Sequence, residues 1–220
     1  YTNRGSIVTP LKDRIGSQIL THYPESIEIA RTITEQESKL DQNQTDVVYV
    51  PSLARDILEQ ISFEARESEY IDNKSGVSAR MSITAFENLI STAERRALIS
   101  GVDKTTLRLS DFVGIIPAIT GKVELVYEGE QEGAYVVAES LIGSAIRTLF
   151  PTYFPKIEKL EKPGEKTPYS DIVEWFFAES GFELLDDASD ADYKSILDEV
   201  SPLEKIKKKY QPQTAKEDEY

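Results

Sequence analysis

The chain has 220 residues, of which 40% are hydrophobic and 29% charged, a composition typical of a globular protein with one good core or two small ones. Its 25 Lys and Arg stand against 39 Asp and Glu, and the formal net charge of -14 argues against a broad surface for nucleic-acid phosphates. The absence of cysteine excludes disulfides, thiolate metal sites and a cysteine nucleophile.

The first 45 residues predict a short strand that leads into a helix. The segment SQILTHYP, residues 17–24, is partly β-branched and ends in a proline, which is typical of a strand. The following stretch, residues 24–40, carries Ile27, Ala30 and Ile33 at helical spacing. We therefore expect a strand over 17–24 and a helix after it.

Residues 46–120 predict three further helices. The first follows Pro51, a residue suited to the first turn of a helix, and the second runs from Ser82 as its N-cap to Gly101 as its C-terminal stop. The third lies in LRLSDFVGIIPAI, residues 107–119, and is expected to begin at Ser110 and to bend or end at Pro117.

The second half predicts one long helix and three short ones. GAYVVAESLIGSAIRTLF, residues 133–150, is amphipathic and is expected to pack on the first half. The Pro- and Gly-containing segment 158–168 is the best linker candidate, and residues 214–220 should fray. Short helices are expected over 169–179, 189–200 and 201–210, the last with a capping box from Ser201 to Glu204. The aromatic residues at 175–177 are interpreted as core.

The cellular setting is predicted from what the sequence lacks. No apolar run approaches the ~20 residues that span a bilayer, and no basic and apolar leader opens the chain. Together with the missing cysteines, this leads us to expect a cytoplasmic protein that binds neither membrane nor nucleic acid. The chain opens at Tyr1 in a polar turn, without Met, so we expect a fragment of a longer protein.

Three candidate sites fail on their residue patterns. GIIPAITGKV resembles a phosphate-binding loop, but six residues separate Gly114 from Gly121 instead of four, and Val123 stands where Ser or Thr should hold magnesium. The acidic residues of segment 124–132 are interpreted as a solvated edge, since nothing fixes a metal geometry. The single histidine, His22, has no nucleophile motif or ligand partner near it and is given no role.

Two arginines remain in specific settings. Arg80 stands in a small-residue stretch just before a predicted helix, where the positive end of the helix dipole disfavours a cation. An anion is therefore expected near it. Arg14 lies in TPLKDRIGSQIL, at the end of a short predicted helix and just before the predicted strand. The alternative for both residues is an ordinary salt bridge on an acidic protein.

The order of these segments resembles the last part of an AAA+ ATPase of the magnesium-chelatase subunit I and MoxR group. TNRGSIVTPLKDRIGSQILTHYP, VVYVPSLARDILEQI and SARMSITAFENLISTAERRAL follow one another as in that family. The family shares an L-x-D-R-F/I segment before the fifth core strand and an S-x-R segment that opens a lid helix. The resemblance covers residues 1–120 and depends on order and spacing more than on one motif.

The resemblance implies a mainly α fold in three parts. Residues 1–45 would be the tail of an AAA+ αβα core, with one short strand plus helices. Residues 46–120 would be the helical lid, and 121–220 a C-terminal helical extension of a bacterial magnesium-chelatase-like subgroup. Arg14 would be the catalytic arginine that reaches the γ-phosphate of ATP in the neighbouring subunit. Arg80 would be the sensor-2 arginine, which binds the nucleotide of its own subunit.

The resemblance also implies the activity of a longer parent. That parent would be a homo-oligomeric ring ATPase, a hexamer, using ATP and Mg²⁺ to remodel a partner such as a von Willebrand factor A domain protein, for metal insertion or maturation. The chain itself has no G-x-x-x-x-G-K-[ST] loop and no hydrophobic strand ending in Asp-Glu, so it should neither bind nor hydrolyse ATP alone. The alternative is an acidic helical interaction module without an ATP role. Insertion of magnesium into a porphyrin is a third option, for which no residue identifies a site.

Overall fold

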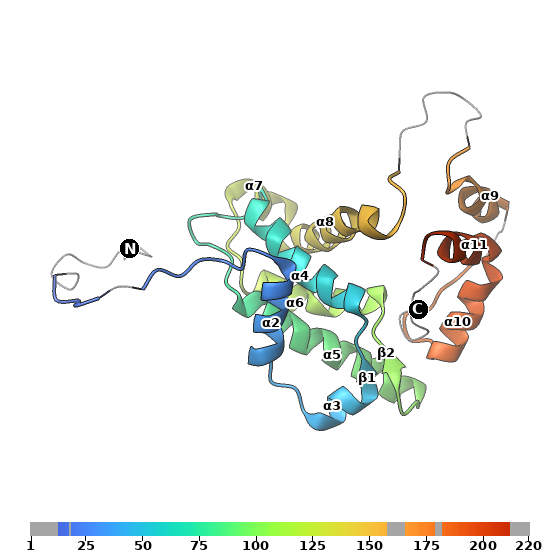
Figure 1. Ribbon diagram of the computed structural model, residues 1–220, viewed down its shortest axis with the longest axis horizontal. Coiled ribbons are helices and arrows are strands. Elements are labelled where there is room, and N and C mark those ends of the chain that lie inside the picture. The colour runs from blue at the N-terminus through green and yellow to red at the C-terminus, as the bar shows by residue number, and fades with distance from the viewer. Residues whose placement is uncertain (1–12, 18, 158–165, 179–181, 212–220) are drawn as a thin grey trace.

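The computed structural model describes residues 13–17, 19–157, 166–178 and 182–211, and it confirms the mainly helical prediction (Figure 1). In chain order the elements are α2 (Ile27–Glu37), α3 (Gln42–Val47), β1 (Val48–Tyr49), α4 (Ser52–Glu67), α5 (Arg80–Ser100), β2 (Thr105–Thr106), the 3-10 helix η1 (Leu109–Ile115), α6 (Ile116–Thr120), α7 (Tyr127–Glu132), α8 (Ala134–Tyr153), α9 (Ser170–Ala178), α10 (Asp190–Glu199) and α11 (Ser201–Tyr210).

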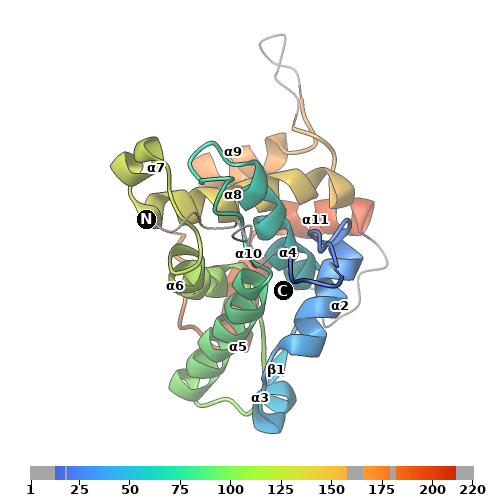
Figure 2. The ribbon, with the colours of Figure 1, turned by 90° about the vertical axis from the view of Figure 1, so that its left-hand side faces the viewer.

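The main core lies between α4, α5, α6 and α8. The buried face of α5 repeats every four residues, which places its apolar side chains on one stripe of the helix. Three alanines on that stripe let neighbouring helices approach closely. Figure 2 shows α2 and α6 on opposite sides of α5, in agreement with their packing against it. The stripe consists of Met81, Ala85, Leu89, Ala93 and Ala97.

The long helix α8 packs on the first half of the chain, as expected from its amphipathic pattern. Its core side chains are Ala138, Leu141 and Ala145, which belong to the same buried cluster as Ile57 and Ile61 of α4. The two helices lie side by side along much of their length. The main core therefore runs continuously from Val48 to Ala145.

A small parallel sheet ties the start of α4 to the end of α5. Val48 pairs with Thr105 and Tyr49 with Thr106, and the Leu107 N–H donates to the Tyr49 carbonyl at 2.9 Å. Because α4 and α5 both lie between the two strands in sequence, this sheet closes a long crossover. It fixes the loop after α5 against the segment that enters α4.

The predicted strand over 17–24 is wrong. Residues 17 and 19–24 have no regular secondary structure. Figure 1 shows the start of this segment extending away from the helices, whereas Tyr23 near its end contacts Val77 and Arg66. Ile19 and Leu20 are 89% and 82% exposed. A strand needs hydrogen bonds from a neighbouring strand, and none pairs with this segment in the described part of the chain.

Residues 107–119 also differ from the single helix that we expected. They form η1 and then α6, and Pro117 stands in the first turn of α6, where its missing N–H is not needed, instead of ending a helix. The predicted start at Ser110 is wrong, since η1 begins one residue earlier. The Asp111 carboxylate accepts the Arg108 N–H at 2.8 Å and closes that turn.

Three short helices, α9, α10 and α11, form a C-terminal unit and confirm the predicted helices in this region. The predicted capping box from Ser201 to Glu204 is wrong: Ser201 is already helical, and Glu204 pairs with Lys208 one turn on, at 2.5 Å. Most of the predicted linker, residues 158–165, lies outside the described residues, as does the predicted frayed end.

The aromatic residues of α9 are only partly buried, so their prediction as core is wrong. Phe176 is 44% exposed and Phe177 88% exposed. Trp175 packs edge to face with Phe176 at 5.0 Å and with Phe182 at 5.6 Å between ring centroids. Three short helices offer too little apolar surface to cover every ring.

Candidate functional site

Arg80 is the first residue of α5 and is exposed. Its backbone N–H donates to the Ser78 hydroxyl at 3.2 Å. Among the described residues, no hydrogen bond or ion pair involves its guanidinium. A charged fork at the positive end of a 21-residue helix is chemically suited to bind an anion.

The predicted N-cap Ser82 is wrong, because α5 begins two residues earlier. Ser82 lies inside the helix, 5% exposed, with its hydroxyl 2.6 Å from that of Ser62 on α4. The residue before the helix is Ala79, which offers no side-chain cap. Ser82 therefore joins two core helices. The first N–H groups of α5 bond to Ser78 instead: that of Arg80 donates to the Ser78 hydroxyl and that of Met81 to the Ser78 carbonyl, at 2.8 Å.

The loop before Arg80 is tied to the segment that precedes α2. Gly76 has a φ of +72°, and a Cβ built on it would lie 2.5 Å from the Tyr23 hydroxyl oxygen. That hydroxyl accepts the Val77 N–H at 3.0 Å. The Arg66 guanidinium lies 4.3 Å from the centroid of the Tyr23 ring. The chain before α2 is thus held beside the loop that leads into α5.

Arg14 lies in an exposed turn at residues 13–14. Within the described ranges its side chain makes no hydrogen bond or ion pair, and none links it with Arg80. The structure therefore does not bring the two predicted site residues together. His22 is exposed, and its Nδ1 lies 2.9 Å from the Tyr23 carbonyl oxygen.

The acidic segment before α8 is a solvated edge, as expected: its four glutamates are exposed, at positions 124, 128, 130 and 132. The part of the chain that the structure describes holds no cluster of three or more acidic or histidine side chains arranged for a metal ion. In the same residues, no helix is both long enough and apolar enough to cross a membrane.

A buried cluster of charges lies where the C-terminal unit meets α5 and β2, and sequence reasoning missed it. Arg96 donates to both oxygens of Asp111, from Nε at 3.1 Å and from Nη2 at 2.9 Å. Its Nη1 reaches Asp190, the first residue of α10, at 3.1 Å, and Arg108 donates to the same carboxylate. Arg96, Arg108 and Asp111 are each no more than 5% exposed.

The charges of this cluster balance, which explains how they can be buried. Burial by itself would raise the pKa of Asp190, but the hydrogen bonds from Arg108 and the Thr106 N–H hold it below its usual value. Burial would lower the pKa of Arg96, and the Asp111 carboxylate raises it instead. The cluster therefore pairs two arginines with two aspartates, so that no buried charge lacks a partner of opposite sign.

One feature of the sequence could have indicated this cluster. Arg96 stands on the buried stripe of α5, three residues after Ala93 and seven after Leu89, where an apolar side chain would be expected. A charged residue at a core position needs a buried partner. Its partner Asp190, however, is 94 residues away in sequence and could not be identified from the pattern.

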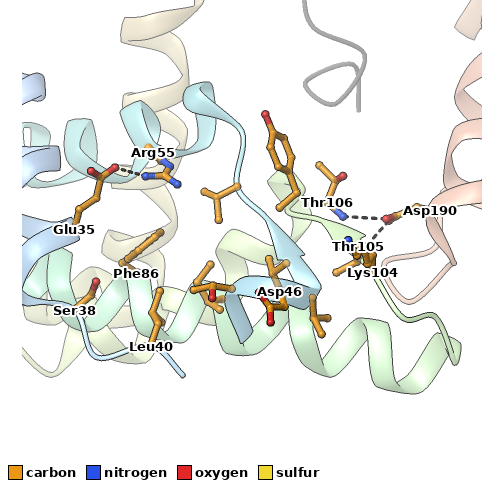
Figure 3. A pocket seen from close by; sticks show the side chains of 16 residues that line it. Glu35, Ser38, Leu40, Asp46, Arg55, Phe86, Lys104, Thr105, Thr106 and Asp190 are labelled. Carbon is orange, nitrogen blue, oxygen red and sulfur yellow. Dashed lines mark hydrogen bonds and ion pairs between the residues drawn. The ribbon is translucent and has the colours of Figure 1, made fainter. Parts of the chain in front are cut away.

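A cavity of about 650 Å³ lies between α2, α3, the small sheet and α5. Figure 3 shows Glu35 and Arg55, which form an ion pair, at one end and Asp190 with Thr105 and Thr106 at the other. The lining is mixed in charge and includes Ser38, Leu40, Thr45, Asp46, Val47, Val48, Tyr49, Val50, Phe86, Ile90 and Lys104. The Thr105 hydroxyl in this lining donates to the Asp190 carboxylate at 3.1 Å.

Comparison of the chain with models of protein families, with curated proteins and with solved structures finds no match.

Proposed function

We propose that this chain is the C-terminal part of a magnesium-chelatase-like AAA+ ATPase, with Arg80 binding nucleotide from the lid. In the full-length protein, ATP hydrolysis with Mg²⁺ drives the remodelling or maturation of a partner, for which a von Willebrand factor A domain protein is the candidate. The subunits form a homo-oligomeric ring in which Arg14 reaches the ATP of the neighbouring subunit. Residues 121–220 are the C-terminal extension of this protein.

The observation that carries this assignment is the position of Arg80. It is exposed at the start of a helix whose other face is buried in the main core, and its guanidinium has no partner among the described residues. A rigid helix holds the charge in place while leaving it free for phosphate oxygens. The positive end of the helix dipole adds attraction for the same anion.

The residues of this chain fit only part of a nucleotide site. Arg80 can donate to phosphate, but the chain offers no Gly-rich loop whose amides and lysine would cradle the phosphates. Isothermal titration calorimetry of this chain with ATP and Mg²⁺ should therefore show no binding tighter than about millimolar. Micromolar binding would contradict the assignment, because one arginine cannot supply that affinity.

Arg80→Ala in the full-length protein is the direct test. A charged hydrogen bond contributes about 1.5–3 kcal/mol, so ATP affinity should fall by about tenfold to a hundredfold, or hydrolysis should become uncoupled from lid movement. Arg95→Ala is the matched control, because Arg95 is an exposed arginine on the same helix. Equal ATP affinity and turnover in both variants would return Arg80 to an ordinary surface charge.

Arg14 is tested by mixing subunits. An arginine supplied by a neighbour accelerates γ-phosphoryl transfer by about a thousandfold or more, so Arg14→Ala should keep ATP binding and lose hydrolysis. Mixing this variant with one disabled in its phosphate loop should restore part of the activity, since some interfaces then combine an intact pocket with an intact arginine. If confirmed mixed rings stay inactive, the trans role of Arg14 is wrong.

A second candidate, an acidic helical interaction module without an ATP role, is favoured by one observation. Val173, Phe176 and Phe177 of α9 are 49%, 44% and 88% exposed, and apolar side chains gathered on one helix are typical of a protein-binding surface. The sequence and the ATPase activity of the full-length protein distinguish this candidate from the AAA+ assignment. If it carries no phosphate-binding loop and shows no ATPase activity, the interaction module is the better reading.

A further inference from the structure

The Asp190 carboxylate is held by donors that all come from outside its own helix. Its Oδ1 accepts from Arg96 Nη1 and from the Thr105 hydroxyl, each at 3.1 Å, and from Arg108 Nη2. Its Oδ2 accepts the Thr106 N–H at 2.9 Å. Two guanidinium groups, a hydroxyl and a backbone N–H therefore converge on one anion.

Three of these donors are held by residues outside the C-terminal unit. Thr105 and Thr106 form strand β2, paired with β1, and Arg96 is held by its two hydrogen bonds to Asp111. Arg108 is 3% exposed, and its guanidinium lies 4.0 Å from the centroid of the ring of Tyr193, which comes from α10 together with Asp190. A set of donors that is positioned in advance binds an anion without the cost of ordering flexible side chains.

The site has more hydrogen-bond donors than the two oxygens of a carboxylate accept evenly. Three donors share Oδ1 while one serves Oδ2, and Arg108 Nη1 is buried with no hydrogen-bond partner. In a planar guanidinium, Nη1 lies directly beside Nη2, which already donates to the anion. A tetrahedral oxyanion carries additional oxygens, and one of them can accept from Arg108 Nη1.

The C-terminal unit that brings Asp190 is separate from the main core. The cluster of core residues between Val48 and Ala145 includes no residue of α9, α10 or α11 in the part that the structure describes. Near the site, the contacts across the boundary are polar or charged: those of Asp190, the Tyr193 ring under Arg108, and the Ser100 hydroxyl on the Asp187 carbonyl at 2.9 Å. Such contacts can open without loss of the core.

We propose that Arg96, Arg108, Thr105 and the Thr106 N–H form a binding site for a phosphate group, which Asp190 fills in this conformation, so that the C-terminal unit is a releasable cover. Thr105, Thr106 and Asp190 line one end of the 650 Å³ cavity, beside the exposed Lys104, so a phosphate group can enter from that side (Figure 3). When Asp190 leaves, Arg108 loses its balancing charge and attracts an external anion. This site is independent of the nucleotide role of Arg80.

Asp190→Ala in this chain tests the site. Inorganic phosphate should bind the variant with a dissociation constant of about millimolar or lower and should shift the NMR signal of the Thr106 amide, while the wild type should bind at least about tenfold more weakly. Acetate, with two oxygens, should bind more weakly than phosphate. O-phosphoserine tests whether the phosphate group comes from an ester or from the free ion. Binding as tight as that of inorganic phosphate assigns the site to phosphate esters, and weaker binding assigns it to the free ion.

The matched control is Asp192→Asn, which removes one charge from the same turn of α10. The Asp192 carboxylate contacts the Ser189 hydroxyl at 2.7 Å and no arginine of the site, so this variant should behave as the wild type. The double variant Asp190→Ala with Arg108→Ala should lose phosphate binding. Absence of phosphate binding by a folded Asp190→Ala protein, or equal binding by the wild type, would overturn the site.

If Asp190→Ala fails to fold, hydrogen exchange on the wild-type chain tests whether phosphate releases the C-terminal unit from the site. Phosphate should speed amide exchange in α10 relative to chloride at the same ionic strength, because it competes with Asp190 for the site. Amides of α5 should exchange at the same rate in both salts. If phosphate and chloride have the same effect on α10, the cover is not released by this anion and the proposal is wrong.

Discussion

The contact between Gly76 and Tyr23 gives a sharp test of how the loop before Arg80 is held. Gly76→Ala places a side chain at a φ of +72°, and its Cβ would lie 2.5 Å from the Tyr23 hydroxyl oxygen. The hydroxyl must then move and release the Val77 N–H, which it accepts at 3.0 Å. Two separable effects therefore add: backbone strain at position 76 and loss of one hydrogen bond.

The expected magnitude follows from these two effects. A left-handed conformation costs a non-glycine residue about 1 kcal/mol, and an ordinary hydrogen bond contributes about 1 kcal/mol. Gly76→Ala should thus lower the free energy of unfolding by about 2 kcal/mol, which corresponds to a melting temperature about 4–8 °C lower in a protein of this size. Gly101→Ala is the matched control, because Gly101 has a φ of +68° and open space around its Cβ position, so it should cost only about 1 kcal/mol.

A double-mutant cycle separates the two effects. Tyr23→Phe removes the hydroxyl, and the nearest ring atom then lies 3.9 Å from the added Cβ, an ordinary contact. The hydrogen bond can be lost only once, so the double variant should cost about 2 kcal/mol and not the sum of about 3 kcal/mol. Urea denaturation of the four proteins measures the cycle. Additive costs, or a Gly76→Ala cost equal to that of Gly101→Ala, would refute the contact.

Two further predictions concern the core. Burial raises the pKa of Glu59 above its ordinary value of 4.5, although hydrogen bonds from Thr34 and Ser82 act in the opposite direction. The folded state therefore favours the neutral carboxyl group, and the protein loses stability as the pH rises through this raised pKa. Glu59→Gln should therefore raise the melting temperature relative to the wild type at pH 7.5 or above, with a smaller increase at pH 4.5. An increase that grows toward acidic pH would contradict the raised pKa of the buried Glu59. Leu89 is 0% exposed, so Leu89→Ala should lower the free energy of unfolding, measured by urea denaturation, by about 2–5 kcal/mol. Leu98 on the same helix is 76% exposed, so Leu98→Ala should change it by less than about 0.5 kcal/mol. Similar changes in the two variants would mean that α5 packs against the core through a different face.

Helices were predictable from the sequence where their apolar spacing was long and regular. The apolar spacing over residues 82–101 and the amphipathic pattern of α8 are set by residues three and four apart, which meet on one helix face whatever the rest of the chain does. The local signals at helix ends were weaker. Ser82 looked like an N-cap, but it lies inside α5 because its hydroxyl meets Ser62 across the helix pair.

The strand over 17–24 failed for a related reason. A short β-branched segment has strand propensity only if a neighbouring strand supplies hydrogen bonds. In the described structure the single small sheet instead joins β1 and β2, whose two-residue strands carry too little pattern to be recognised. Tyr23, the residue of that segment with a defined role, is held by Val77 and Arg66, which lie on other elements.

By itself the sequence determined the helical class, the long amphipathic helices α5 and α8 and the place of Arg80 near a helix start, since all of these depend on residues close together in the chain. Only the tertiary structure decided the anion site of Arg96 and Arg108. Its donors come from α5, β2 and the residue before η1, and Asp190 reaches them from 94 residues away from Arg96. Such a cluster exists only when the C-terminal unit docks, because burial in a low dielectric and the balance of opposite charges arise at that contact and not in any one segment.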